Sequence, residues 1–566
     1  MDVFDVAVVG GALAGAGTAL ALLRQQPDLR VLVVEREEAF TRRVGESTVE
    51  LSTYFLTRTL GLTRHLVQHH IVKQGFRYWF TNERATDMGR ATEMGGRYLT
   101  RVASYQVDRP VLDEEVLRRV REAGGEVWRP AQVREIELNP SGLQMLTIRD
   151  ARQQTRRVGA RWVVDASGRK AVIARQRGEV RPIQGHPTAA VWARWRHTLD
   201  FDGSDLTGRF PQLGERFYGT RHTATNHIMG EGWWAWVIPL RNGETSVGVT
   251  WDQRLFRWPR TPGTSLGQQL RQVLETHPVG RELLRDAELV EGDEHIRRNL
   301  PYVCQTPADD GFVLVGDAAG FIDPFYSMGL DNLTITATSG VDLILAERRG
   351  PAAGETRAQH AAACEKMRDR HNAMVGTSLP RWFDGVFRDK YVYMGDFELM
   401  RIAFLVEISL YYLGLIAPPY QRGRSTIKDG MFYSPVSLPF YWFMRWVNRR
   451  LTAIALVRRR RGTFGRANAD RRMLVPGFAF DLSIPKANAK ALWALLKLEV
   501  REGWRSWRPA RGDDGSVRID EPADTEPGPA MGSASRGGSA EPAARQHVAS
   551  AEPAAKPAAE PVAPMA

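Results

Sequence analysis

The sequence predicts an α/β fold (α+β overall), and three observations support this prediction. Residues 3–35 contain an apolar strand, a glycine turn, a helix and a second strand that ends in an acid, the order of a Rossmann-like unit. Strand-like and helix-like segments alternate to about residue 345, with an inserted mixed β-sheet domain at about 180–300. Residues 346–508 are mainly helical, aromatic and basic, whereas 509–566 form a Pro/Ala/Gly-rich tail that we expect to be disordered.

Composition places the chain among globular proteins. It has 566 residues, 43% hydrophobic and 25% charged, which suffices for two or more domains. Two cysteines cannot form a disulfide framework or a four-ligand zinc site, so we expect a reducing, cytoplasmic location and no metal. The start, MDVFDVAVVGG, has no basic residues before its apolar run, so we do not expect a signal peptide there. The net charge of +12 is spread along the chain without a nucleic-acid module, so we expect no nucleic acid.

The glycine turn predicts dinucleotide binding. Gly10 and Gly15 hold the first and third positions of G-x-G-x-x-G, while Ala12 replaces the middle glycine, whose role is to let backbone approach a pyrophosphate. The helix N-terminus still offers N–H groups and a positive dipole to phosphate. A second strand ends in Glu35, which can accept hydrogen bonds from an adenosine ribose. We expect cofactor contacts at Gly10, Ala12, Ala14, Gly15 and Glu35; an α/β turn without cofactor is the alternative.

Three later segments extend this pattern of strands and turns. They are YQVDRPVLDEEVLRRV, WVVDASGR at 162–169 and DGFVLVGDAAGFIDP at 310–324. The ordered set resembles the FAD-binding monooxygenase class, in which one FAD lies extended across a Rossmann-like domain. By this resemblance Glu35 binds the adenosine ribose, Arg43 and Arg109 lie near the phosphates or the ribityl chain, and Asp317 binds the ribityl hydroxyls. We find no second glycine fingerprint for a nicotinamide nucleotide, so we expect reduced FAD (FADH2) from a separate flavin reductase.

Three short motifs narrow the resemblance. WAWVIP at 234–239 matches a WxWxIP signature, and FIDPFYSMG at 321–329 matches FxxPxxSxG. VKQGFRYWF at 72–80 is similar to a Lys-x-Gly-x-x-Phe strand segment through Lys73. Together they resemble the flavin-dependent halogenases, of the phenol or pyrrole type, over roughly residues 1–345.

The resemblance implies a reaction and a set of roles. FADH2, O2 and halide would give hypohalous acid through a flavin C4a-hydroperoxide, and this acid would pass to Lys73, the implied catalytic residue. As a cation Lys73 can polarise the acid, and as an amine it can form a haloamine. The N-terminus of the helix that starts near Met328 offers a halide site without a titratable side chain. The implied loop residues are Pro324, Ser327, Met328 and Gly329.

Two further roles concern residues that border the cofactor. Strand alternation places Trp234, Trp236 and Ile238 on one face and Trp233 on the other, so the first two indoles are candidates for the wall of a tunnel between flavin and substrate. A core strand is the structural alternative. Glu46, in VGEST, matches a Gly-Glu-Ser segment near the flavin and is expected close to the cofactor. Ser327 also has the position of a helix N-cap.

Departures from the family pattern indicate the substrate class. Tryptophan halogenases carry a glutamate shortly before the serine of the halide loop, whereas this chain has Pro324, Phe325 and Tyr326 there. We therefore expect an electron-rich phenol, resorcinol, pyrrole or aryl polyene precursor, either free or bound to a carrier protein, in secondary metabolism. Met328, Leu330 and Asp331 are unusual for the loop and leave halide binding open.

Other functions remain open on the same sequence. They are an FAD-dependent monooxygenase or hydroxylase, a membrane-associated flavin reductase of an isoprenoid or polyene, and a flavin-binding partner protein without chemistry. The apolar segment 400–420, which contains Glu407, predicts a buried helix. Together with 440–461 it gives the alternative of peripheral contact with the inner face of a membrane through 400–461.

Overall fold

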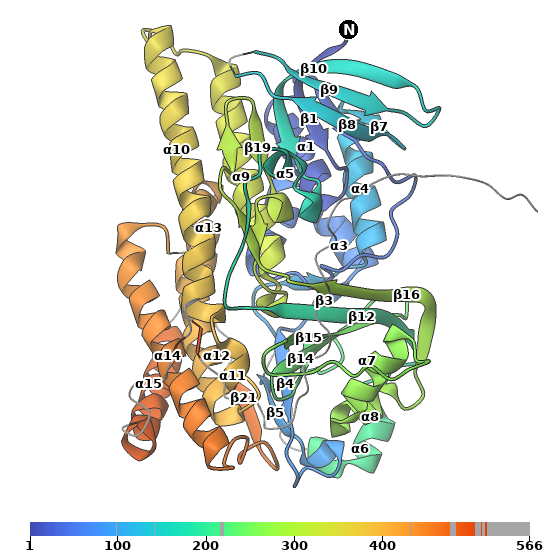
Figure 1. Cartoon of the computed structure of the whole chain (residues 1–566), viewed down its shortest axis with the longest axis vertical. Helices are drawn as coiled ribbons and strands as arrows, with labels where there is room; N and C mark the ends of the chain where they lie inside the picture. The colour runs from blue at the N-terminus through green and yellow to red at the C-terminus, as the bar shows by residue number, and fades with distance from the viewer. Residues whose placement is uncertain are drawn as a thin grey trace, which may run out of the picture. The chain divides into compact units, whose positions relative to one another are not determined.

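A mostly parallel sheet carries the predicted glycine turn, as the computed structural model shows (Figure 1). The strand order is β18 (Ala308–Asp309), β19 (Phe312–Leu314), β10 (Thr155–Asp165), β1 (Val3–Val9), β2 (Val31–Val34), β7 (Glu126–Trp128). Neighbouring strands from β19 to β7 pair in parallel, whereas β18 pairs antiparallel with β19. β8 (Gln132–Glu137) and β9 (Gln144–Arg149) form a hairpin beside β10. The apolar run of β1 is continuous because β10 and β2 pair with its two edges and an apolar core covers each of its faces.

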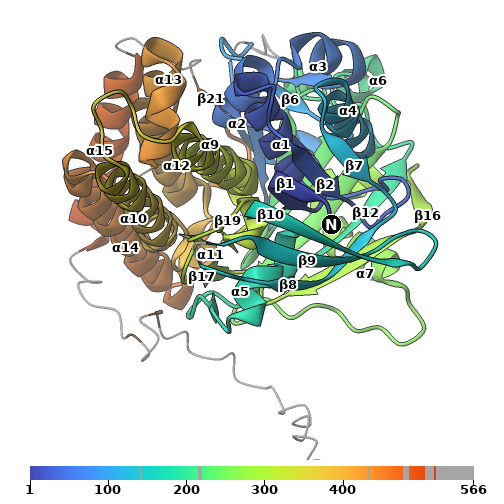
Figure 2. The ribbon, with the colours of Figure 1, turned by 90° about the horizontal axis from the view of Figure 1, so that it is seen from above.

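The structure describes residues 1–97, 99–140, 142–214, 220–430, 432–475, 483–503, 511 and 516–517. The predicted tail, 509–566, lies outside the described residues except for those three last positions. One face of the parallel sheet packs on α1 (Leu13–Gln25), α4 (Arg109–Glu122) and α9 (Met328–Arg349) in a single apolar core. Figure 2 shows α1 and α9 on this face, with α10 (Arg357–Trp382) alongside α9. The Rossmann-like part of the prediction is confirmed.

A second, mixed sheet lies below the first in Figure 1. Its face that holds Trp233 packs on α7 (Leu266–Glu275) and α8 (Pro278–Leu284). The strand order is β16 (Glu288–Arg298), β12 (Thr188–Arg196), β15 (Thr245–Asp252), β14 (Trp233–Pro239), β13 (Thr225–Met229), β4 (Phe76–Phe80), β5 (Thr92–Gly96), β21 (Arg472–Val475). Three of these strands lie outside the expected range of 180–300: β4 pairs in parallel with β13, β5 follows β4 in the sheet, and β21 pairs in parallel with β5.

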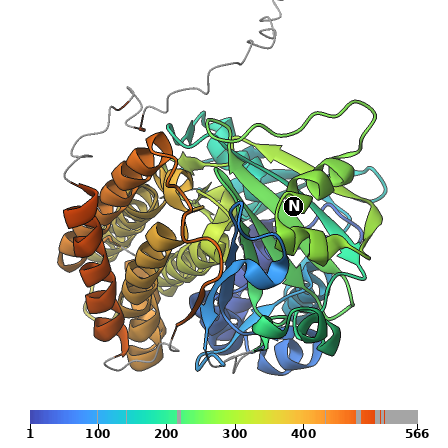
Figure 3. The same cartoon turned by 90° about the horizontal axis from the view of Figure 1, so that it is seen from below.

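The C-terminal helices stand as one block beside the strands, drawn orange to red in Figure 3. They include α11 (Lys390–Tyr393), α12 (Phe397–Tyr411), α13 (Ala417–Arg422), α14 (Leu438–Arg460) and α15 (Ser483–Arg501). Within the described residues, the helical segment Phe397–Arg422 is long and apolar enough to cross a membrane, but 78% of its most apolar window is buried. The segment 400–420 is therefore mostly buried, as its sequence predicts.

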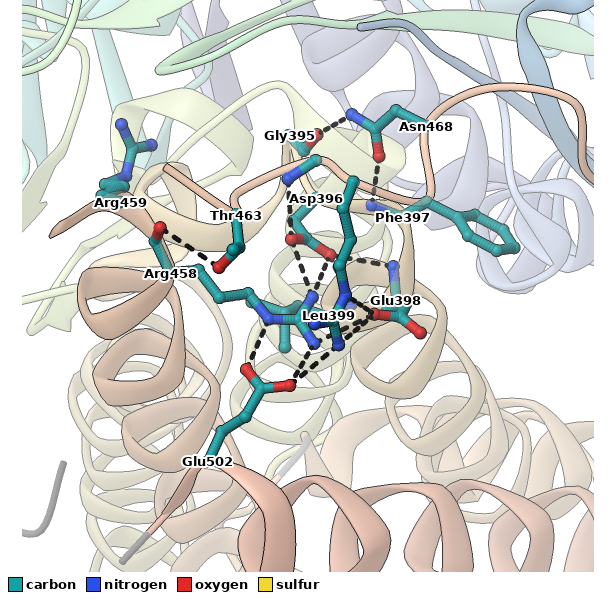
Figure 4. A network of polar contacts seen from close by, with 12 residues as sticks. Gly395, Asp396, Phe397, Glu398, Leu399, Arg458, Arg459, Thr463, Asn468 and Glu502 are labelled. Atoms are coloured by element: carbon teal, nitrogen blue, oxygen red, sulfur yellow. Dashed lines mark hydrogen bonds and ion pairs between the residues drawn. The ribbon is translucent and has the colours of Figure 1, made fainter. Parts of the chain in front are cut away.

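A buried arginine fastens three of these helices together (Figure 4). Arg458 of α14 donates to Asp396, at the N-cap of α12, at 2.8 Å and to Glu502, which follows α15, at 2.8 Å. Its third contact is Glu398, at 3.0 Å. Asp396 also caps α12 by accepting from the backbone N–H of Glu398 and Leu399. Because Arg458 is fully buried, its removal would leave carboxylates without a cation in the interior.

We predict that Arg458→Met lowers the free energy of unfolding by about 3–5 kcal/mol, the usual cost of breaking a buried ion pair from one side. Urea denaturation followed by circular dichroism measures this change. Arg349→Met, at an exposed position near the end of α9, is the matched control and should change stability by less than about 0.5 kcal/mol. Equal stability of the two variants would contradict the structural role of Arg458.

Candidate active site

The glycine turn brings the first strand and α1 close enough to form a cradle. Gly10 has φ +103°, and a Cβ on it would lie 2.6 Å from the Ala166 carbonyl oxygen. A Cβ on Gly15 would lie 1.8 Å from the Gly10 carbonyl oxygen, so this position requires close helix–strand packing. Ala12 and Ala14 line a large cavity in front of the turn, so the Ala12 methyl forms part of the cavity wall. The N–H groups at the start of α1 face the same region.

Glu35 follows β2 directly and closes the turn from the other side. Its carboxylate accepts the backbone N–H of Gly11 at 2.7 Å and that of Glu37 at 2.9 Å. A carboxylate has about four acceptor positions. Two therefore remain for a diol in the cavity that Glu35 lines. This is the arrangement expected for an adenosine ribose site.

The large cavity has a volume of about 580 Å³ and joins the predicted cofactor residues. Arg109 is held by Asp113 at 3.1 Å and by the Val44 carbonyl at 3.0 Å, and Arg43 lies over the Phe40 ring at 5.0 Å. The predicted residues that line the cavity are Gly10, Ala12, Ala14, Glu35, Arg43, Glu46, Arg109, Asp317, Trp234, Trp236, Pro324, Ser327 and Gly329. Gly15 lies behind the turn, and Lys73 and Met328 are not among the lining residues.

Two further residues that line this cavity are acids, Asp317 and Glu46. Asp317 lies in a turn that Asn332 of α9 fixes by donating to the Gly316 carbonyl at 3.0 Å. Burial raises the pKa of Asp317, against the effect of Arg169 and Arg109. Burial likewise raises the pKa of Glu46, although Arg194 donates to it and acts in the opposite direction. Glu46 is therefore positioned by an arginine that sequence reasoning did not single out.

The loop before α9 presents a helix N-terminus to the cavity. Tyr326 and Ser327 have φ +67° and +60°, two consecutive left-handed residues that are rare outside glycine. Ser327 holds the N-cap position of α9, as the sequence predicts, but its side chain makes no cap hydrogen bond. The left-handed backbone turns the chain into α9 without it. The first N–H groups of this 22-residue helix thus lie beside Pro324, Ser327 and Gly329 at the cavity wall.

The tryptophan strand forms one wall as alternation predicts. Trp234, Trp236 and Ile238 of β14 line the large cavity, while Trp233 packs in the separate core under α7 and α8. Trp234 Nε1 donates to the Tyr391 hydroxyl at 2.9 Å, and Trp236 Nε1 donates to Ser246 Oγ at 3.2 Å. With their N–H groups satisfied, the indoles are fixed in place as an apolar wall.

Lys73 lies at the end of β3 (Ile71–Lys73), and only 1% of it is exposed. Its Nζ donates to Ser47 Oγ and to the Thr48 carbonyl, both at 2.8 Å, and lies 3.9 Å from the centre of the Phe76 ring. Burial lowers the pKa of Lys73 to about 7, while Glu50 and Asp331 oppose the shift. Ser47 lines the large cavity and Phe76 lines a second one, so Lys73 lies between the two.

The second cavity, of about 30 Å³, is apolar and lies under the C-terminal helices. Met328 lines it instead of the large cavity, together with Phe76 and Tyr326. The other lining residues come mainly from the C-terminal half, among them Trp382, Val386, Phe404, Glu407, Leu410, Tyr411 and Met444. The helical region therefore supplies most of this wall.

Glu407 is the acid that this region contributes. Both of its oxygens accept from Lys390 Nζ at 2.7 Å, and Oε2 also accepts from the Tyr326 hydroxyl at 2.7 Å. Burial raises the pKa of Glu407, and Lys390 opposes this shift. The sequence signal for it was an acid inside the most apolar segment of the chain, a position that is rare without a partner.

A second buried chain of polar contacts was not predicted. Asp323 Oδ2 lies 3.0 Å from His186 Nε2 and accepts from the Tyr391 hydroxyl at 3.0 Å. Tyr391 in turn accepts from Trp234 Nε1. The chain links the halide loop, α11 and the tryptophan strand. Asp323 also accepts the backbone N–H of Phe325 at 3.0 Å, so it makes a local turn and at the same time joins the loop to α11.

Comparison with known proteins defines the class. Residues 3–357 match the FAD binding domain family, and the chain belongs to that family. The cradle at Gly10, the open acceptors of Glu35 and the exposed helix N-termini fit FAD.

The similar proteins are named as halogenases. The chain is 25% identical over 366 residues to the flavin-dependent halogenase chlA of Dictyostelium discoideum. The aligned part covers 58% of this chain and 57% of the relative. It is 26% identical over 465 residues to the sulochrin halogenase gedL of Aspergillus terreus. This aligned part covers 74% of this chain and 80% of the relative. The chain thus spans little more than half the length of the first of these relatives.

Solved structures share the fold. Halogenase PltM superposes with a TM-score of 0.65 at 18% identity, covering 88% of this chain and 96% of PltM. PltM is also known in complex with phloroglucinol and FAD. The myxobacterial chondrochloren halogenase CndH superposes with a TM-score of 0.55 at 20% identity, covering 91% of this chain and 99% of CndH. The predicted fold class is confirmed.

We predict that Glu35→Ala raises the dissociation constant of FAD about tenfold or more, because the ribose loses its carboxylate acceptor. Titration of the purified protein with FAD, followed by flavin fluorescence, measures the constant. Glu38→Ala, three residues further on and exposed, is the control and should leave it unchanged. Unaltered FAD affinity in Glu35→Ala would contradict the ribose site.

Proposed function

We propose that the protein is an FAD-dependent halogenase of an electron-rich aromatic such as a phenol, resorcinol, pyrrole or aryl polyene precursor. The observation that carries the proposal is the place of Lys73, a desolvated amine between a cavity that fits FAD and an apolar cavity beside it. The names of the relatives support this reading. We propose a cytoplasmic enzyme that acts in secondary metabolism.

The residues of the cofactor site would bind FAD and exclude water from it. When bound, reduced FAD from a separate flavin reductase supplies the activation of O2 by which halide is oxidised. Glu35 holds the adenosine ribose, Arg43 and Arg109 lie near the phosphates or the ribityl chain, and Asp317 binds the ribityl hydroxyls. Trp234 and Trp236 then separate the flavin end of the cavity from the substrate and suppress direct hydroxylation.

The N-terminus of α9 is the proposed halide site. Its free N–H groups and the positive end of its dipole favour an anion without a side chain that titrates. The left-handed backbone at Tyr326 and Ser327 holds these groups toward the cavity. No acid lies among the loop residues 324–329, and burial raises the pKa of Asp331, in the first turn of α9, to about 8, which favours its neutral form.

Lys73 transfers the halogen. As a cation it donates a hydrogen bond to hypohalous acid and makes the halogen more electrophilic. As an amine it exchanges an N–H proton for the halogen and releases water, which leaves a haloamine. A pKa of about 7 makes both forms available near neutral pH.

The aromatic substrate, free or carrier-bound, would enter from the side of the small cavity. Side chains such as Met328 and Phe404 must move to admit a ring, because the cavity is about 30 Å³. Glu407 has one acceptor position left beside its three hydrogen bonds and can receive a substrate hydroxyl or pyrrole N–H. The buried helix Phe397–Arg422 walls this side, so we do not propose membrane contact through it.

The test is product mass spectrometry with a flavin reductase, NADH, O2 and a panel of phenols, with and without bromide. We predict brominated product that Lys73→Ala reduces by at least about a thousandfold while FAD binding persists. Lys366→Ala, at an exposed lysine of α10, is the control and should retain activity.

Two outcomes would overturn the proposal. Hydroxylated product without dependence on bromide would identify a monooxygenase. Full halogenation by Lys73→Ala would remove Lys73 from the reaction.

A further inference from the structure

The solvent-facing side of α15 carries several large apolar residues, whereas the solvent-facing side of a surface helix is usually polar. Leu492, Leu496 and Val500 follow one another every four residues and so lie on one stripe of the helix. Leu496 is 53% and Val500 74% exposed, and the neighbouring Trp493 is 59% exposed. With Leu492, four large apolar side chains are in contact with solvent and form a patch typical of an interaction site.

The charges on the same helix have one sign. Lys486, Lys490, Lys497 and Arg501 are exposed, and Lys497 Nζ lies 5.2 Å from the centre of the Trp493 ring. The one acid within α15, Glu499, accepts from Arg450 of α14 at 2.7 Å and is thereby turned toward the neighbouring helix. Along residues 484–501 the exposed charged side chains are therefore all basic.

α14 presents a similar surface beside it. Trp442 is 55% and Trp446 47% exposed, one helical turn apart, and Phe440 in the first turn is 47% exposed. Arg445 lies over the Trp442 ring at 5.2 Å, and Arg449 is exposed. We call the exposed apolar and basic residues of α14 and α15 the aromatic-basic face.

The inner side of α15 holds this face in place. Ala491, Leu495 and Leu498 are buried in the core that also contains α12. The Arg458–Glu502 ion pair fastens the end of the helix to α14 and to the start of α12 (Figure 4). The face is thus a built surface on anchored helices.

We propose that the aromatic-basic face docks the protein peripherally on an anionic lipid bilayer. Tryptophan is favoured at the headgroup level, where its ring is buried and its N–H stays solvated, and lysines flanking an apolar stripe pair with acidic headgroups. A second copy of the chain fits less well, because a two-fold contact would bring lysines against lysines. Interface cores of protein partners are likewise poor in lysine. The inference does not depend on the proposed halogenation.

Flotation of the full chain with vesicles tests the proposal. We expect the protein to float with phosphatidylcholine–phosphatidylglycerol vesicles and much less with phosphatidylcholine alone, and to be released by high salt. The variant Lys486→Glu, Lys490→Glu, Lys497→Glu should bind about tenfold more weakly or worse, and Trp493→Ser with Leu496→Ser likewise. Lys366→Glu on α10 and Val67→Ser, both exposed and distant in sequence, are the matched controls.

Three results would overturn docking on anionic lipid. They are equal flotation with neutral vesicles, unchanged binding of the triple charge variant, and a stable dimer in sedimentation that Trp493→Ser with Leu496→Ser dissociates without any vesicle binding. Far-ultraviolet circular dichroism and FAD titration confirm that each variant is folded. Loss of halogenation without loss of flotation would leave the docking face standing.

Discussion

The desolvation of one ammonium group, that of Lys73, is the interaction on which the rest of the site depends. Water is replaced around it by one hydroxyl, one carbonyl and the face of an aromatic ring, from Ser47, Thr48 and Phe76. Burial then favours the neutral amine, and Glu50 and Asp331 limit the shift. Ser47 is itself held by Thr225, at 3.0 Å between the two hydroxyls.

The C-terminal helices are part of the site and not an appendage to it. Glu407 of α12 holds Tyr326 of the halide loop, and Tyr391 of α11 joins Trp234 to Asp323. A left-handed loop backbone persists where surrounding contacts determine it. Buried hydrogen bonds to Glu407 and Asp323 provide such contacts, so the FAD-binding part and the helical part are expected to fold around the site together.

Local patterns in the sequence predicted what is local in the structure. The strand, glycine turn, helix and Glu35 are contiguous, and the alternation of Trp233 and Trp234 follows from strand geometry alone. The partners of Glu407, Asp323 and Arg458 were not predicted, since periodicity carries no information on contacts between distant segments. The same limit hid the pairing of β4, β5 and β21 with the second sheet, although 72–80 was expected to contain a strand. Ser327 holds the N-cap position in a left-handed conformation, with φ +60°, rather than the extended one usual for a capping serine, and it makes no cap bond.

Direct titration of the Lys73 side chain tests the central claim, a desolvated amine between the two cavities. Nitrogen-15 NMR of lysine-labelled protein, with the Nζ resonance assigned by its absence in Lys73→Met, reports the pKa of this group alone. The structure predicts a pKa of about 7. A pKa near the value of an exposed lysine, about 10.4, would show that Lys73 is hydrated and would contradict its place between the cavities.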